Sequence, residues 1–166
     1  VNHIESFYYI KDNVEKLTAA SPTQVSGSKV FYVDDSYANL VGAGQNNNGI
    51  ADIKLVHSVN DLNVVATDTI SIGNYNTLDG LNGTGTITGY HLEDAAATIT
   101  GAVADIRNTA INITATGVTS VNDATTLKNA TNAGTTQINA ISGNAAQVSG
   151  SSDPVLNLVS GTVTVT

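Results

Sequence analysis

Short apolar strands alternate with helix-like segments along this chain. In FYVDDSYANL, residues 31–40, alternation puts Phe31 and Val33 on one face of a strand and Tyr32 and Asp34 on the other. After the second aspartate the apolar spacing changes to that of a helical turn. Strand-like clusters also lie near residues 8, 64, 88, 113, 138 and 163, mostly about 24 residues apart. The longer interval after residue 31 contains AGQNNNG and a further strand-like run, IKLV.

The clusters belong to an internal repeat. Residues 63–101 align without gaps onto residues 112–150, with identical residues at eleven positions. This periodicity predicts a repeat solenoid of parallel β-strands, about 24 residues per turn, with short helices or helical turns between strands (mixed α/β or β-solenoid). Residues 1–62 are expected to form diverged N-terminal turns or a cap. Residues 63–166 are expected to form a solenoid of roughly 49-residue double repeats, incomplete at the C-terminus.

The two ends of the array carry different side chains. Phe7, Tyr8 and Tyr9 have the bulk to close the N-terminal end, whereas the final TVTVT has strong strand propensity and no charge. We expect this last strand to continue into further repeats of a longer parent, or to pair with a neighbouring subunit.

The adjacent carboxylates Asp34 and Asp35 suggest a metal site or an acid–base pair. The pattern aromatic–x–aliphatic–x–Asp recurs in YYIKD and YHLED, where it keeps Asp12 and Asp94 but has Lys or Glu in place of Asp34. A position repeated within one chain indicates architecture, because an active site is needed only once. Asp12, Asp35 and Asp94 are therefore predicted to be helix N-caps, with a ligand role as the alternative.

Two capping boxes are expected in addition. Asp12 has Glu15 three residues later, and Ser120 has Asp123 at the same spacing before an apolar run.

Composition narrows the class of protein. The net charge is −8 with six Lys plus Arg, which argues against nucleic acid and anionic lipid as partners. No apolar run reaches the length of a membrane span. The absence of cysteine removes disulfides, thiol nucleophiles and zinc–thiolate sites. Together with the richness in Thr and Asn, this composition favours a secreted bacterial surface protein.

No enzyme signature occurs. HExxH, GxSxG, Walker and Rossmann patterns are all missing, and the histidines are His3, His57 and His91, the last expected on the surface. The sequence therefore predicts no catalytic residue. The alternative is a polysaccharide-cleaving carboxylate pair of Asp34 with Asp12 or Asp61.

Calcium is the cofactor that the acids would suit best. The GGxGxDxUx nonapeptide is absent, and LDGLNGTG lacks the ladder of acids that a calcium site needs. We assign no metal or cofactor residue; the alternative is a weak site at Asp34 and Asp35 or in QNNNG, residues 45–49.

Residues 90–150, from YHLEDAAATITG through NITAT and ATTLKNATNAGTT to AAQVSG, resemble a repeat of very large bacterial surface proteins. The resemblance implies a secreted adhesin, sheath, filament or surface-layer component. It thereby implies an extracellular location and a structural role. Separately, we expect self-association through strand edges or adjacent repeats, with surface glycans as alternative partners. The resemblance carries over no catalytic residue. Gly143 and Asn139 depart from the repeat, and residues 41–62 match poorly. The alternative function is a glycan-binding fibre or a polysaccharide-cleaving β-solenoid.

Overall fold

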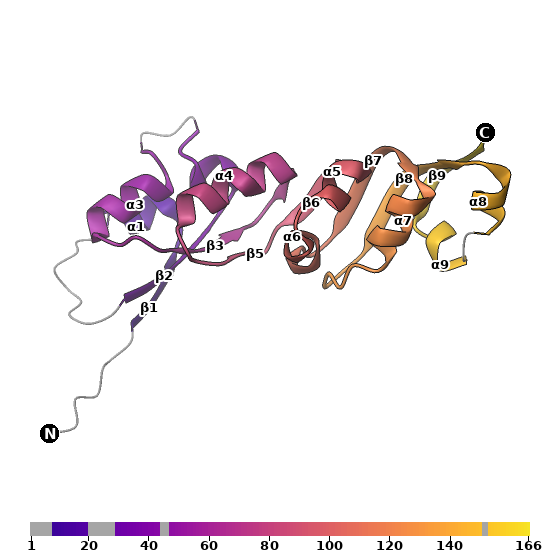
Figure 1. The fold of residues 1–166 in the computed structure, drawn as a ribbon. Coiled ribbons are helices and arrows are strands. Elements are labelled where there is room, and N and C mark those ends of the chain that lie inside the picture. Colours follow the sequence, from indigo (N-terminus) through magenta and orange to yellow (C-terminus); the bar gives the residue numbers. More distant parts are fainter. Residues whose placement is uncertain (1–7, 20–28, 44–46, 151–152) are drawn as a thin grey trace, which may run out of the picture. The chain divides into compact units, whose positions relative to one another are not determined.

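The structure is a computed structural model that describes residues 8–19, 29–43, 47–150 and 153–166. The chain divides into two compact α/β units (Figure 1). The first unit comprises Val1–Asp68 and Asn74–Gly89, and the second comprises Thr69–Gly73 and Tyr90–Thr166. Within the described ranges each unit has one sheet, and all strand pairs in both sheets are parallel.

The first sheet has four strands in the order β1-β2-β3-β5. Alternation in β2 buries Phe31 and Val33, while Tyr32 and Asp34 on the opposite face stay partly exposed. Val64 of β3 continues the buried row, because it pairs with Val33. The elements are β1 (Tyr8–Asp12), α1 (Val14–Ala19), β2 (Lys29–Asp35), α2 (Tyr37–Leu40), α3 (Ile50–His57), β3 (Asn63–Ala66), α4 (Ile72–Asn82) and β5 (Ile87–Thr88).

The second sheet has five strands in the order β4-β6-β7-β8-β9. Its buried row runs through Leu92 and Ile113, with Ala115 and Ile138 in the next row. The elements are β4 (Thr69–Ile70), β6 (His91–Ala95), α5 (Ala96–Gly101), α6 (Ala104–Thr109), β7 (Ile113–Ser120), α7 (Val121–Lys128), β8 (Thr136–Gly143), α8 (Ala145–Ser149), α9 (Asp153–Leu156) and β9 (Val159–Val165).

The prediction of a repeat solenoid is wrong. Strands do lie at the predicted clusters, but they belong to two separate parallel sheets rather than to one continuous array. The chain leaves the first sheet after β3, adds the two-residue β4 to the second sheet, and returns through α4 to β5. Gly89 has a φ of 81°, so the apolar cluster around residues 87–95 bends into β5 of one sheet and β6 of the other.

A second correction concerns the run IKLV, which lies in helix α3 rather than in a strand. Ile50 and Ile53 are fully buried at helical spacing, and the helix ends at Ser58 in the left-handed conformation, with φ 53°. A short apolar run has the same pattern in a buried helix as in a strand, which explains the error.

The N-terminal turns are expected from the sequence to end at residue 62. Strand β3 begins at Asn63 and pairs with β2 in the first sheet. The expected aromatic end cap falls on Phe7 and on the side chains of Tyr8 and Tyr9, which lie outside what the structure describes. Within the described residues, no helix combines the length and the hydrophobicity that crossing a membrane requires.

Candidate functional site

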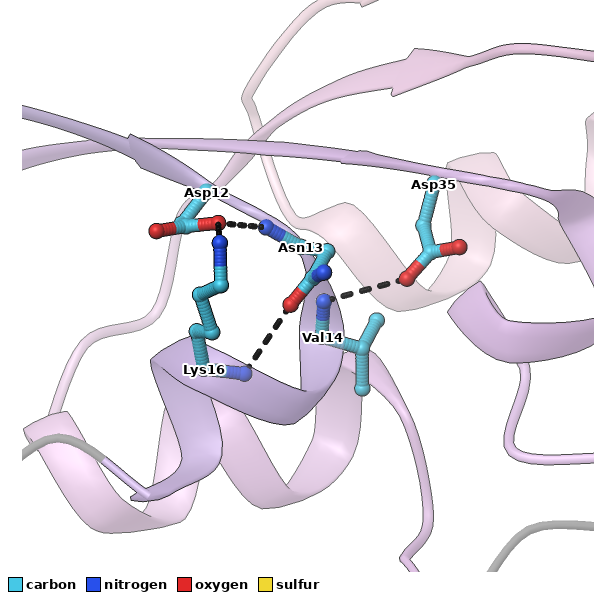
Figure 2. A network of polar contacts seen from close by, with 5 residues as sticks. All are labelled: Asp12, Asn13, Val14, Lys16 and Asp35. Atoms are coloured by element: carbon cyan, nitrogen blue, oxygen red, sulfur yellow. Dashed lines mark hydrogen bonds and ion pairs between the residues drawn. The ribbon is translucent and has the colours of Figure 1, made fainter.

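The carboxylate of Asp35 joins two neighbouring strand–helix pairs (Figure 2). Its Oδ2 accepts from the backbone N–H of Val14, the first residue of α1, at 3.2 Å. Its Oδ1 accepts from Ser36 N at 2.8 Å and from Asn39 Nδ2 at 2.7 Å. The first amides of a helix have no partner inside the helix, and a carboxylate also suits the positive end of the helix dipole. One side chain therefore stabilises both its own turn and the preceding helix.

Two further aspartates make the same connection. Both oxygens of Asp68 accept from Tyr37 N, the first amide of α2, at 3.0 Å. Asp94 Oδ2 accepts from Ile72 N, the first amide of α4, at 3.2 Å, and its Oδ1 accepts from Ala95 N at 2.8 Å. Asp68 lacks the aromatic that marks the repeated pattern, so the motif did not identify it. In each case an acid at or just after a strand end caps a helix 21 to 31 residues earlier.

The predicted aspartates Asp12, Asp35 and Asp94 are therefore not the N-caps of the helices that follow them. Asn13 caps α1, because its Oδ1 accepts from Lys16 N at 3.0 Å, and Ser36 caps α2. Ala95 stands at the N-cap of α5 without a side-chain bond. The error is one residue in position: each predicted aspartate precedes the actual N-cap, and Asp35 and Asp94 extend across to the preceding helix.

The capping boxes differ from expectation as well. Ser120 is the N-cap of α7, as the spacing predicted, and its side chain accepts from Asp123 N at 3.1 Å. Asp123 Oδ2 accepts from the Ser120 hydroxyl at 2.7 Å, in place of the backbone N–H that a capping box would use. Asp12 and Glu15 do not frame a helix start, because Asn13 is the cap. The reciprocal box that sequence reasoning missed is Asn144 with Gln147 at α8. Its N-cap-x-x-Gln spacing was a readable signal.

Gly143 explains one departure from the repeat. Ser142 pairs with Ser120, so Gly143 lies beside Val121, the first residue of α7. A Cβ at Gly143 would lie 3.0 Å from Val121 Cγ2. The position where other strands carry an aspartate is therefore crowded here, and α7 relies on its own Ser120 cap.

Asp34 and Asp35 lie on opposite faces of β2 and do not form a pair. Asp34 Oδ2 is 2.9 Å from Lys11 Nζ, on the face away from the buried Phe31 and Val33. The alternation of β2 explains this separation, because successive side chains point to opposite faces. A joint metal or catalytic role for these two neighbours has no geometric basis.

The structure does bring Asp34 near Asp12. Both line a surface hollow together with Lys11 and Asn13. However, each carboxylate has its own lysine, since Asp12 Oδ1 is 3.2 Å from Lys16 Nζ (Figure 2). The N–H of Asn13, at 2.9 Å, and the charge of Lys16 lower the pKa of Asp12. A general acid needs a raised pKa instead.

Asp61, the other acid in the catalytic alternative, does not line this hollow. Its Oδ1 accepts from Thr84 N at 2.7 Å, and this bond lowers the pKa of Asp61.

Asp61 and Thr84 exemplify a second repeated contact, a hydrogen bond from a Thr to an Asp or Asn 23 residues away. Asn63 Oδ1 accepts from Thr86 N at 3.0 Å and Thr86 Oγ1 at 2.8 Å. Asn112 Oδ1 accepts in the same way from Thr135 N at 2.7 Å and Thr135 Oγ1 at 3.2 Å. The same separation joins Asp61 to Thr84, Thr100 to Asp123, and Asn108 to Thr131.

These contacts give some of the Thr and Asn residues a structural role. Each one joins two residues of the same unit, and the Asn63–Thr86 and Asn112–Thr135 contacts join equivalent positions just before the paired residues of neighbouring strands. The side-chain oxygen of a short Asp or Asn residue can accept a hydrogen bond from an exposed backbone N–H of the neighbouring strand–helix pair. These Thr, Asn and Asp side chains thus link neighbouring segments of the same unit.

The described histidines make structural contacts. His57 Nε2 lies 2.7 Å from the Leu17 carbonyl oxygen, and its ring lies 4.6 Å from that of Phe31. His91 is half-buried, and its Nδ1 lies 2.9 Å from Asn112 Nδ2, which ties it to the Asn112–Thr135 contact. His3 lies outside the described residues.

In the described part of the chain, no three His, Asp or Glu side chains gather at a site that would hold a metal ion. The QNNNG segment is described from Asn47 onward. Asp52 accepts from Asn48 N at 2.8 Å and Asn48 Nδ2 at 3.0 Å, and these bonds lower the pKa of Asp52. The polar groups of this loop therefore bond to one another around the start of α3.

Comparison with known proteins adds no relative. No family model, curated protein or solved structure matches the chain.

Proposed function

We propose that the chain is a structural or adhesive segment of a secreted bacterial cell-surface protein. The observation that carries this proposal is the repeated Asx–Thr contact between residues 23 apart, exemplified by Asn63–Thr86 and Asn112–Thr135. An enzyme needs its polar groups once, in one place. Here the polar side chains are used repeatedly to hold successive strand–helix pairs together.

The acids support the same proposal. Asp35, Asp68 and Asp94 accept hydrogen bonds from first helical amides, and Asp12 and Asp34 are paired with lysines. The resemblance of residues 90–150 to bacterial surface repeats and the net charge of −8 agree with an extracellular structural role.

Surface labelling tests the location. Antibodies raised against the purified chain are applied to intact and to permeabilised cells of the bacterium that produces the protein. We expect intact cells to be labelled as strongly as permeabilised ones, with a cytosolic protein labelled only after permeabilisation. Labelling that requires permeabilisation would contradict the proposal.

Incubation with bacterial surface polysaccharides separates a structural role from a catalytic one. We expect no new reducing ends from the wild-type chain. Turnover that disappears in Asp34→Asn would establish a polysaccharide-cleaving enzyme instead, since Asp34 and Asp12 line the same hollow. Retention on a glycan array without turnover would support the adhesive form of the proposal.

A further inference from the structure

The side-chain amide of Asn112 is held at both ends. Its Oδ1 accepts from Thr135 N at 2.7 Å and from Thr135 Oγ1 at 3.2 Å. Its Nδ2 lies 2.9 Å from Nδ1 of His91. Because the two Thr135 donors need an oxygen, they fix which end of the amide faces His91. The amide nitrogen only donates, so Nδ1 of His91 is the acceptor, and the ring carries its proton on Nε2.

A protonated His91 does not fit this arrangement. Both nitrogens of an imidazolium carry hydrogen, so Nδ1 would present an N–H to the NH2 group of Asn112. Rotation of the Asn112 amide restores the contact by turning Oδ1 toward His91, and a hydrogen bond from a charged donor is stronger than one from a neutral donor. The same rotation takes Oδ1 away from Thr135. The oxygen of Asn112 then serves His91 instead of Thr135.

The strands around His91 contain few other groups that titrate. His91 is half-buried and lies on the face of β6 opposite the buried Leu92. Its neighbours across the sheet are Thr69 of β4, with which it pairs, and Asn112 just before β7. Neither β4 nor β7 contains a titratable residue, and the charged residue on the same face of β6 is Glu93.

The remaining charged side chains near this sheet have contacts of their own or are exposed. Asp94, on the other face of β6, accepts from the first amide of α4. Arg107 of α6 donates to a backbone carbonyl, and Asp123 of α7 accepts from two hydroxyl groups. Asp105 and Lys128 are exposed, and α5 contains no charged residue. The proton that decides the orientation of the Asn112 amide is therefore the one on His91.

The first unit has the same Asx–Thr contact without a histidine. Asn63 Oδ1 accepts from Thr86 N and Thr86 Oγ1, as Asn112 does from Thr135. The residue that pairs with Asn63 on the preceding strand is Tyr32. A tyrosine phenol ordinarily titrates near pH 10, whereas a histidine imidazole titrates at about pH 6.5. The Asn63 contact is thus an internal reference for the Asn112 contact.

The other described histidine keeps one role in both protonation states. His57 Nε2 lies 2.7 Å from the carbonyl oxygen of Leu17. A carbonyl oxygen only accepts, so this nitrogen is a donor whether the ring is neutral or charged. Of the two described histidines, His91 is the one whose contact reverses on protonation.

We propose that His91 makes the Asn112–Thr135 contact an acid-sensitive link between the start of β7 and the start of β8. At neutral pH the Asn112 amide bonds to both neighbours. When His91 takes up a proton, the amide turns to His91 and Thr135 N loses its acceptor. The corresponding link of the first unit, between Asn63 and Thr86, stays closed. This inference does not depend on the proposed surface location.

Amide hydrogen exchange by NMR tests the link, with Thr86 as the control in the same molecule. Protection factors, which correct for the intrinsic effect of pH on exchange, are measured from roughly pH 8 to roughly pH 5, a range that spans ordinary imidazole titration. The ring nitrogen shifts of His91 report its protonation. We expect the proton on Nε2 at the upper end, and a several-fold fall in protection at Thr135 that follows the titration of His91. Protection at Thr86 should stay constant.

Two variants show whether the effect comes from His91. His91→Tyr copies the arrangement of the first unit, and His91→Gln offers an uncharged acceptor at the same position. In both, protection at Thr135 should no longer change over this pH range. Constant protection at Thr135 while His91 titrates, an equal fall at Thr86, or a fall at Thr135 that persists in both variants would overturn the proposal. A neutral His91 ring with its proton on Nδ1 would overturn it as well.

Discussion

The carboxylate of Asp35 bonds to the first amide of a helix that begins 21 residues earlier, at Val14. Its second oxygen accepts from Ser36 N and Asn39 Nδ2 in its own turn. This double use distinguishes Asp35 from an ordinary N-cap and changes the effect expected of its substitutions.

Asp35→Ala should lower the free energy of unfolding by about 1–2 kcal/mol, since it removes the acceptor for Val14 N, Ser36 N and Asn39 Nδ2. Asp35→Asn should lie between wild type and Ala, because it keeps only one acceptor oxygen. Urea denaturation measures both. The matched control is Asp34→Ala on the opposite face, where an exposed ion pair contributes about 0–1 kcal/mol. Equal losses at positions 34 and 35 would contradict this interpretation.

The Asn112–Thr135 contact should contribute measurably to the second unit. Asn112→Ala removes the acceptor for Thr135 N and Oγ1 and the contact with His91, so we expect a loss of about 0.5–1.5 kcal/mol in unfolding experiments. Thr135→Ser should be close to wild type, because it keeps both donors. Asn122→Ala, at an exposed position of α7, is the control. A loss at Asn122 as large as that at Asn112 would show that the separation of 23 residues has no special role.

Two glycines should respond to alanine in opposite directions. A Cβ at Gly80, in helix α4, meets nothing within 4 Å, so Gly80→Ala should raise stability by about 0.5–1 kcal/mol through helix propensity. A Cβ at Gly85 would lie 1.9 Å from the Leu62 carbonyl oxygen, so Gly85→Ala must displace backbone and should destabilise the first unit. Thermal unfolding of the two variants compares them directly. Stabilisation by both would show that Gly85 is not in close contact with Leu62.

Acid should weaken the chain through Asp12, Asp52 and Asp61. For each of these carboxylates the main cause is a hydrogen bond from a backbone amide, which lowers the pKa from its usual 3.8. The donor is Asn13 for Asp12, Asn48 for Asp52 and Thr84 for Asp61. Because the folded-state pKa lies below the unfolded one, the stabilisation is complete above the unfolded value and is lost as the pH falls through the folded value. Carboxyl titration by NMR should place all three pKa values below 3.8. Asp61→Asn should reduce the loss of stability that occurs when the pH is lowered from neutral to below the folded-state pKa values. An unchanged loss would show that Asp61 does not contribute to this pH dependence.

The strands were predictable because β-branched and aromatic residues alternate with polar ones, as in residues 31–35, and because the clusters recur. Their division into two sheets was not, since it depends on the positive φ of Gly89 and on the two-residue strand β4. Neither feature changes the local apolar pattern.

The polar contacts were predictable in part. The pair Asn63 and Thr86 recurs as Asn112 and Thr135 when the repeats are aligned, which is a signal for the Asx–Thr contact. The cap that Asp35 makes to Val14 depends on strand register, which a pattern within one strand–helix segment does not contain. For this reason the aspartates were assigned to their own helices.

The repeated acids Asp35, Asp68 and Asp94 hold neighbouring strand–helix pairs together through helix amides. Amide hydrogen exchange at Val14 tests this role most directly, because this N–H donates to Asp35 Oδ2. Asp35→Ala should accelerate exchange at Val14 markedly, Asp34→Ala should leave it unchanged, and added calcium should have no effect on either. Exchange at Val14 that is indifferent to Asp35, or that responds to calcium only when Asp35 is present, would contradict the account.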